Sequence, residues 1–283
     1  MDYTPPTIPY DHQISKLLIR CCRLGTEQYL KSKEDPIYDG AIAVLESYSS
    51  ELEQYEQVES FRTVQNHFDL KKSKDSSDHG KLVYYGFVLS SPQNHIVIYR
   101  GTQLLVEWIA NIQFPQEPYL TEYPDSGLVH TGFRTIYDQN LAEQTRKIVR
   151  QLNPDLPCYI AGHSNGASLA VLAAIDLAIH IPKIQPQIQM YCYGCPRVGD
   201  PTFAEFYGKR VPNSYRVTNL ADVIPLLPPS KLGDISYFHV GQEWSFLNQL
   251  GDTDPNHLIA TYREAIEAQV EVSEERKYPN SGC

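Results

Sequence analysis

The chain has 283 residues, of which 42% are hydrophobic and 20% are charged. This balance is typical of folded globular proteins, and the length suits one large α/β domain. The formal charge of −10 argues against a nucleic-acid-binding surface, which needs a basic face. It also argues against long-range attraction to anionic membranes, but it leaves local apolar docking open.

The first twenty residues lack the pattern of a secretion signal, because prolines and acidic residues interrupt them. The most apolar segment, Ala167–Ile181, is too short to span a bilayer and carries Asp176 in its middle. The six cysteines form no regular disulfide framework. We interpret Cys192 and Cys195, although spaced as a C-x-x-C pair, as packing residues. These features favour a reduced, cytoplasmic protein.

The first half of the chain changes from a helical to a strand pattern near residue 80. Apolar residues spaced by three and four predict helices over Ile14–Leu30 and Ile37–Phe68. Residues rich in β-formers then predict strands over Lys81–Ser90 and His95–Arg100, joined as a hairpin.

Strands and helices alternate through the rest of the chain. A second hairpin is expected from Ile235–Val240 and Gln242–Phe246. The alternation predicts an α/β fold with a mostly parallel sheet and helices on both faces. The other expected elements are strands over Cys158–Ala161, Ile188–Tyr193 and Ser214–Asn219, and helices over Thr131–Leu152, Ala167–His180, Pro201–Gly208 and Asn256–Val270.

The strongest local motif is Gly162-His163-Ser164-Asn165-Gly166, between a predicted strand and an apolar helix. A sharp strand-to-helix turn lifts the serine hydroxyl above the sheet. Glycines two residues before and after it remove Cβ atoms that would collide across the turn. We therefore predict Ser164 as a nucleophile, with an incidental serine in a glycine-bordered turn as the alternative.

A nucleophilic serine needs a base and a carboxylate, in the chain order Ser, Asp, His. Asp222 follows the strand Ser214–Asn219, at the edge where α/β folds place their sites. Its alternative role is a helix cap or a solvated loop residue. The competing carboxylates, each in a loop without so clear a strand before it, are Asp200, Asp234, Asp252 and Asp254.

Two histidines follow Asp222. His257 begins the last predicted helix after a loop, so we favour it as the base. His239 lies inside a predicted strand and is expected to pack there. His163 precedes the nucleophile and is expected to pack beside the turn.

An oxyanion hole is expected from two N–H groups. The first belongs to Asn165, directly after the nucleophile. The second is expected from the Arg100-Gly101-Thr102 turn, where Thr102 also offers its hydroxyl, although a simple turn remains the alternative.

At this point the sequence resembles the class 3 lipases, the fungal-type lipase and feruloyl esterase family, from about residue 80 to about residue 270. The resemblance implies an α/β-hydrolase core there, within a single domain over 1–283 that carries a helical extension over about 1–75. The motifs that carry it, in order, are Ile96–Thr102, Val129–Phe133, Gly162–Gly166, Tyr193–Asp200, Val217–Pro225 and His257.

The resemblance implies that Ser164, Asp222 and His257 form a catalytic triad, with Thr102 and Asn165 as the oxyanion hole. It implies a cofactor-free enzyme that cleaves carboxylic esters, often of acylglycerols, and that touches a membrane or lipid-droplet surface transiently. The alternatives are a soluble short-chain esterase or thioesterase, and a silent relative that binds lipid or protein.

Two features depart from the family. The usual turn continues Ser-Leu-Gly-Gly-Ala, whereas this one reads Ser164-Asn165-Gly166-Ala167-Ser168. The fungal members are secreted and disulfide-bonded, which this sequence does not suggest.

Family members carry a mobile lid after the Arg-Gly-Thr turn, and here that segment is Gln103–Phe114. It has an apolar stripe at helical spacing, so we expect either a lid or a fixed core helix. The stripe consists of Leu104, Leu105, Trp108, Ile109 and Ile112.

Overall fold

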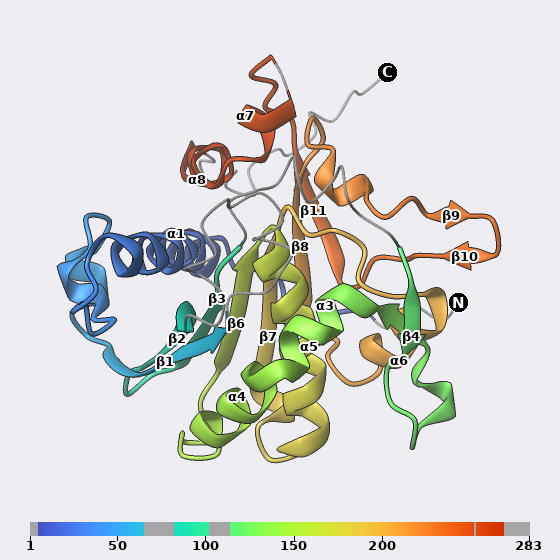
Figure 1. Ribbon diagram of the computed structural model, residues 1–283, viewed down its shortest axis with the longest axis horizontal. Helices are drawn as coiled ribbons and strands as arrows, with labels where there is room; N and C mark the ends of the chain where they lie inside the picture. The colour runs from blue at the N-terminus through green and yellow to red at the C-terminus, as the bar shows by residue number, and fades with distance from the viewer. Residues whose placement is uncertain (1–4, 65–81, 102–113, 252, 269–283) are drawn as a thin grey trace, which may run out of the picture.

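A seven-stranded sheet forms the centre of the molecule (Figure 1). The computed structural model describes residues 5–64, 82–101, 114–251 and 253–268. The first two pairs of neighbouring strands are antiparallel, and the remaining pairs are parallel. In spatial order the strands are β1 (Glu56–Val64), β2 (Leu82–Ser90), β3 (His95–Tyr99), β6 (Cys158–His163), β7 (Ile188–Tyr193), β8 (Ser214–Asn219) and β11 (Gln242–Phe246).

Helices cover both faces of this sheet. On one face α1 (His12–Glu34) packs with α8 (Ile259–Ala268), and on the other α5 (Asn165–His180) packs with α4 (Ala142–Val149) (Figure 1). Because α5 lies between the sheet and other helices, its residues are buried on all sides from Asn165 to Ala178. The shorter helices are α3 (Thr131–Ile136), α6 (Pro201–Gly208) and α7 (Thr253–His257).

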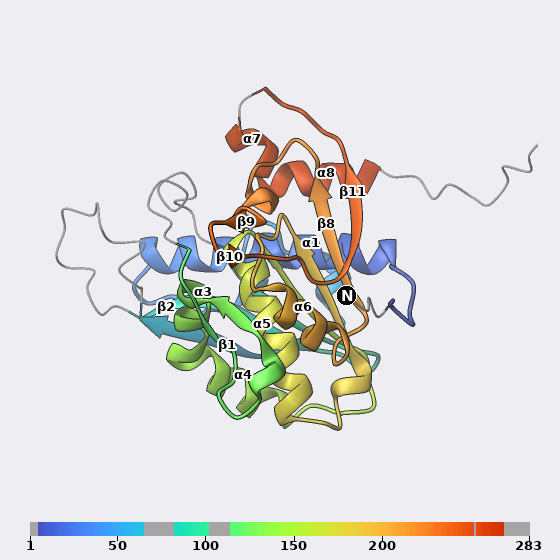
Figure 2. The same ribbon diagram turned by 90° about the vertical axis from the view of Figure 1, so that its right-hand side faces the viewer.

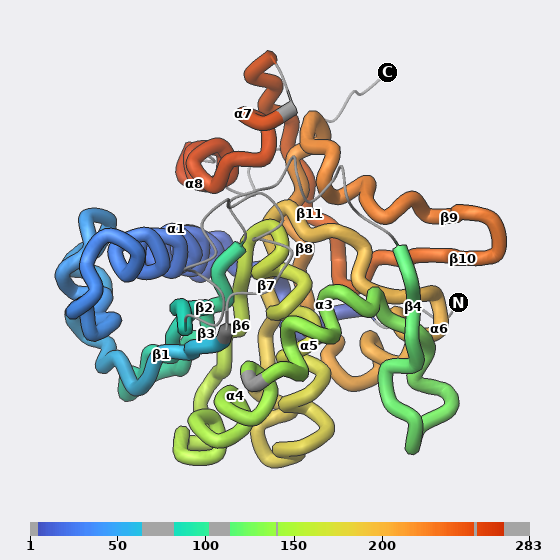
Figure 3. Tube along the Cα trace, in the orientation of Figure 1, coloured from blue at the N-terminus to red at the C-terminus, as the bar shows by residue number. Residues whose placement is uncertain are grey.

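A long segment connects β8 to its neighbour in the sheet, β11. It forms the short hairpin β9 (Lys231–Leu232) and β10 (Ile235–Ser236), and then β11 runs parallel beside β8 (Figure 3). A second small hairpin joins β4 (Gln116–Pro118) to β5 (Leu128–His130). In Figure 2 the arrowhead of β8 points toward α8, so the carboxyl ends of the parallel strands lie under α7 and α8.

Most predicted elements of the parallel half are confirmed. Strands β7 and β8 and helix α6 begin and end as the sequence predicts. The hairpin of β2 and β3 is confirmed, with Ser90 opposite His95. The helix predicted over 131–152 is present as α3 and α4, joined by a five-residue π-helical segment at Tyr137–Leu141.

The helix predicted over Ile37–Phe68 is wrong. Residues 42–44 and 50–52 form single 3₁₀ turns, and β1 occupies Glu56–Val64 as an edge strand of the central sheet. In β1 the side chains of Phe61 and Thr63 are buried, whereas Arg62 between them is exposed. This alternation is that of an edge strand paired with β2. The helix prediction failed because it used only local spacing, which does not reveal pairing with a distant segment. The N-terminal extension is therefore not wholly helical.

The second predicted hairpin is also wrong. Residues 237–240 are not a strand, apart from an isolated bridge between Phe238 and Gly199, and β11 pairs with β8 instead. His239 consequently lies in a loop. The last helix is also divided, because α7 ends at His257 and α8 begins at Ile259.

Within the described ranges, no helix is long and apolar enough to cross a membrane. The five cysteines in the described part of the chain are buried free thiols: Cys21, Cys22, Cys158, Cys192 and Cys195.

Candidate active site

Ser164 lies in a strained turn between β6 and α5. Its φ of 59° and ψ of −129° make it the sole non-glycine residue with a positive φ among the described residues. A conformation of this kind costs on the order of 1–3 kcal/mol and persists where the surroundings enforce it. Here the Ser164 N–H donates to the Tyr193 carbonyl on β7, and the Ser164 carbonyl accepts from Ala167 in α5.

The glycines around Ser164 are required by close backbone approach, as the sequence predicts. A Cβ on Gly162 would lie 2.1 Å from the Gly166 carbonyl oxygen. A Cβ on Gly166 would lie 2.3 Å from the Tyr99 carbonyl oxygen. The turn is thus pressed against its own helix and against β3, which fixes the position of the Ser164 side chain.

Asp222 follows β8 and is held by three donors. The Ile224 N–H donates to Oδ1 at 2.9 Å. His257 Nδ1 and the Tyr262 hydroxyl both donate to Oδ2, each at 2.6 Å. Asp222 is 2% exposed, so these bonds replace the hydration of its carboxylate.

His257 is oriented by that bond to Asp222. Because the carboxylate accepts from Nδ1, the proton of the neutral ring resides on Nδ1 and leaves Nε2 as an acceptor. Nε2 is buried and has no hydrogen-bond partner among the described residues. Gly194, with φ 56°, makes room for the ring, since a Cβ there would lie 2.9 Å from His257 Cε1.

Ser164 and His257 are linked indirectly, through their neighbouring residues. Ser164 bonds to Tyr193, and the next residue, Gly194, contacts the His257 ring. The His163 ring, directly before Ser164, packs against His257 with centroids 4.7 Å apart. No hydrogen bond joins Ser164 directly to His257 in the part of the chain that the structure describes.

His163 stays uncharged beside His257. Loss of hydration, followed by the nearby His257, lowers the pKa of His163 well below its ordinary value. A hydrogen bond with the His257 backbone acts in the opposite direction. A neutral ring here adds no charge next to the His257 imidazole, and the packing role expected for His163 is confirmed.

The predicted oxyanion groups are only partly within the described residues. Asn165 is the first residue of α5, so its N–H belongs to the positive end of that helix. The turn before Thr102 lies against the serine, since a Cβ on Gly101 would lie 2.7 Å from the His163 carbonyl oxygen and 3.2 Å from Ser164 Cβ. Thr102 itself lies outside the described residues, and so does the predicted lid stripe: Leu104, Leu105, Trp108, Ile109 and Ile112.

The competing residues lie elsewhere. Asp200 caps α6 by accepting from Phe203 N. Asp234 and Asp254 are exposed, and Asp252 lies outside the described residues. His239 donates through Nε2 to the Pro225 carbonyl and has no contact with Asp222 in the described structure.

Two supporting residues are not evident from the sequence. Tyr262 bonds to Asp222, and burial first, then Asp222, raises its pKa well above the ordinary value, so it remains a donor. Asn219 is fully buried and its side chain joins Ala221, Asn248 and Asn256. The only sequence signal for Tyr262 is its place shortly after His257, within the helix predicted over Asn256–Val270.

Comparison with known proteins identifies the architecture around this site. Residues 96–232 match the family model described as lipase (class 3). A Rhizomucor miehei lipase is 32% identical over 152 residues, which is 52% of this chain and 40% of that protein. The crystal structure of a lipase from Rhizopus microsporus var. chinensis superposes with a TM-score of 0.66 at 23% identity, over 89% of this chain and 84% of that one. The matched segment is therefore similar to the class 3 lipases.

The likeness to solved lipase structures confirms the α/β-hydrolase fold predicted from the sequence. A secreted mono- and diacylglycerol lipase A from Penicillium cyclopium is 30% identical over 178 residues, which is 61% of this chain and 55% of that protein. The matched segments thus span about half the length of these curated relatives.

The lowered pKa of His163 predicts acid destabilisation. Below the unfolded-state pKa of about 6.5, the unfolded chain binds a proton at this position that the folded chain does not, so stability falls as pH falls. Urea unfolding at pH 7.5 and 5.5 measures the loss. His163→Gln should reduce this pH-dependent loss of stability by about 1 kcal/mol. An equal loss in the variant and the wild type would contradict the neutral assignment.

Proposed function

We propose that this protein is a class 3 lipase, a carboxylic ester hydrolase that acts on acylglycerols or other lipid esters through an acyl-enzyme on Ser164. The observation that carries the proposal is the 2.6 Å bond from His257 Nδ1 to buried Asp222, beside the strained turn that holds Ser164. Together these supply a nucleophile, a base whose free nitrogen is an acceptor, and a fixed carboxylate.

The reaction proceeds in two halves. As Ser164 Oγ attacks the ester carbonyl carbon, His257 Nε2 takes its proton and later gives it to the departing alcohol. Water, deprotonated by the same nitrogen, then attacks the acyl-enzyme and releases the acid. Asp222 stabilises the charged imidazole, and the N–H of Asn165, with Thr102 as the proposed second donor, holds the oxyanion.

The substrate class rests on the relatives and on the surface beside the site. The matched relatives are named as lipases, among them a mono- and diacylglycerol lipase. The alternative functions are those of a short-chain esterase, a thioesterase or a catalytically silent binding protein. Ester hydrolysis assays distinguish them from a lipase. A cytoplasmic location remains a proposal supported by the buried free thiols, whereas the Penicillium relative is named as secreted.

Four exposed leucines surround the end of β8 and form what we call the leucine rim. Hydrogen bonds of the buried Asn219 hold together the segments that carry them. Because Asp222 and His257 belong to the same segments, the rim lies beside the proposed triad. Its members are Leu220, Leu247, Leu250 and Leu258, exposed by 61%, 69%, 50% and 55%.

An apolar rim of this kind suits a lipid surface. Burying an exposed leucine side chain in an apolar phase stabilises the bound state by about 1.5–3 kcal/mol. Since the chain carries a net charge of −10, contact through the rim would favour an uncharged or zwitterionic surface over an anionic one. We also propose Gln103–Phe114 as a lid over the acyl site, because its sequence carries an apolar stripe that suits such a surface.

The central test is hydrolysis of p-nitrophenyl esters of two to sixteen carbons, with and without micelles. Ser164→Ala should lower kcat by on the order of 10⁴-fold, and His257→Ala by a similar factor, because the pair acts as a unit. Ser32→Ala, on α1, is the matched control and should keep the native rate. A folded protein that neither turns over any ester nor reacts with a fluorophosphonate would exclude the serine mechanism.

Tyr262→Phe tests whether the tyrosine positions Asp222. Loss of a hydrogen bond to a carboxylate should lower kcat by about tenfold, while KM stays within about twofold. The control is Tyr207→Phe, which removes a buried hydroxyl bonded to Ser214. If both variants lower kcat in step with their melting temperatures, Tyr262 has only a structural role.

Removal of two rim residues tests the lipid surface. Leu247→Ser with Leu258→Ser should weaken binding to phosphatidylcholine vesicles by about tenfold or more. The rate on emulsified ester should fall further than the rate on a dissolved one. Ile37→Ser with Val44→Ser removes two comparably exposed residues, 90% and 62%, from another region and is the control. Equal losses in both double variants would argue against a specific rim.

A further inference from the structure

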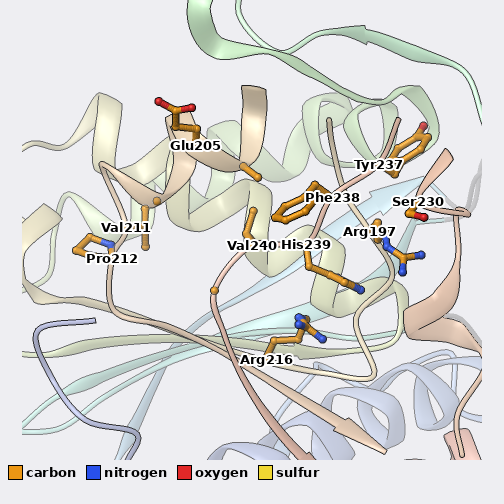
Figure 4. Close-up of a pocket in the computed structure, with 13 residues that line it drawn as sticks. Arg197, Glu205, Val211, Pro212, Arg216, Ser230, Tyr237, Phe238, His239 and Val240 are labelled. Carbon is orange, nitrogen blue, oxygen red and sulfur yellow. The ribbon is translucent and has the colours of Figure 1, made fainter. Parts of the chain in front are cut away.

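A cavity of about 470 Å³ lies apart from the proposed triad (Figure 4). Helix α6, the turn after β7, strand β8 and the segment before β11 form its walls. None of Ser164, Asp222 and His257 is among the residues that line it. The cavity therefore needs an explanation other than ester cleavage.

One wall of the cavity is rich in nitrogen donors. Arg197, Arg216 and His239 lie close together there (Figure 4). Arg216 is 8% exposed, and its Nε is buried with no hydrogen-bond partner among the described residues. Its two terminal nitrogens bond to Thr218 Oγ1 and to Glu243. A buried guanidinium N–H without an acceptor is costly, and a ligand oxygen would satisfy it.

The charges at this wall do not balance. Glu243 forms an ion pair with Arg216 at 2.9 Å. Arg197 is bonded to the carbonyl oxygens of Leu226 and Pro228, and no carboxylate pairs with it among the described residues. Glu205 at the edge is paired with Lys209.

His239 adds no charge to this balance. Burial, followed by the two arginines, lowers the pKa of His239 to about 2. The wall thus carries one guanidinium charge more than its carboxylate neutralises, which favours an anionic ligand.

Four apolar side chains also line the cavity and form its apolar wall: Val211, Pro212, Phe238 and Val240. Gly208, at the end of α6, also borders the cavity, and a Cβ there would meet no atom within 4 Å. The cavity thus offers a cationic end and an apolar end, with a volume in the range of small-molecule sites.

We propose that this cavity binds a single-chain anionic amphiphile, with its carboxylate or phosphate head at Arg197 and Arg216 and its chain along the apolar wall. A guanidinium binds either head through two parallel N–H···O bonds. The head also supplies the acceptor that Arg216 Nε lacks. This site is independent of the proposed ester hydrolysis, because it uses none of the triad residues.

Calorimetry with decanoate, decyl phosphate and decanol below their micelle concentrations tests the proposal. Decanoate or decyl phosphate should bind at least about tenfold more tightly than decanol, because only the anions pair with the arginines. The anion that binds with the higher affinity identifies the preferred head group. Equal affinity for all three ligands would overturn the proposal.

Variants locate the bound ligand. Arg197→Gln should weaken anion binding by about tenfold or more, and Gly208→Leu should block it by filling the apolar end. Arg150→Gln, an exposed arginine elsewhere, is the control and should bind as the native protein does. If Arg197→Gln and Gly208→Leu both bind normally while folded, the ligand does not occupy this cavity.

A second measurement separates this site from the proposed acyl site. With decanoate labelled by ¹³C at the carboxyl carbon, pairing with arginine should make the bound carboxyl titrate at a lower pH than the free one. The shift should persist in Ser164→Ala and vanish in Arg197→Gln. Loss of the shift in Ser164→Ala would place the ligand at the serine and overturn the proposal. Binding without any ester turnover would refute the proposed hydrolysis and leave this site standing.

Discussion

Close backbone approach around Ser164 is the constraint on which the rest of the site depends. The carbonyl oxygens of Gly166, Tyr99 and His163 lie within 2.1 to 2.7 Å of where Cβ atoms of Gly162, Gly166 and Gly101 would be. Strands β3 and β6 and helix α5 converge there so tightly that only glycine fits. The convergence enforces the positive φ of Ser164, and the apolar surface of α5, buried all round, supports it from below.

The other half of the site depends on a buried amide rather than on a turn. Asn219 joins the end of β8 to the segments around Asn248 and Asn256, while Tyr262 joins α8 to the same strand end and to Asp222. Since His257 directly follows Asn256, these bonds determine where its ring lies. The same bonds hold the leucine rim beside the triad, so the catalytic and apolar surfaces have a common structural cause.

The sequence predicts those parts of the fold whose cause is local. The turn at Ser164 and the strands β7 and β8 are evident because glycine spacing and short β-rich runs identify them. The two wrong predictions, a helix in place of β1 and a hairpin that includes β11, have a non-local cause. Each of these edge strands pairs with one strand that is distant in the sequence, β1 with β2 and β11 with β8. Tyr262 and Asn219 could not be recognised for the same reason. A helical tyrosine and a strand-end asparagine become donors to a site only after distant segments meet.

The six residues of strand β8 contribute to both the proposed active site and the cavity beside α6. Successive side chains of a strand point to opposite faces, so Tyr215 and Val217 belong to the core beneath α1 and α8, while Arg216 faces the cavity beside α6. Asp222 follows the carboxyl end of the same strand. Strand β8 pairs with β7 on one side and with β11 on the other, which sets its place in the sheet. Asp222 of the proposed triad and Arg216 of the cavity therefore take their positions from one strand.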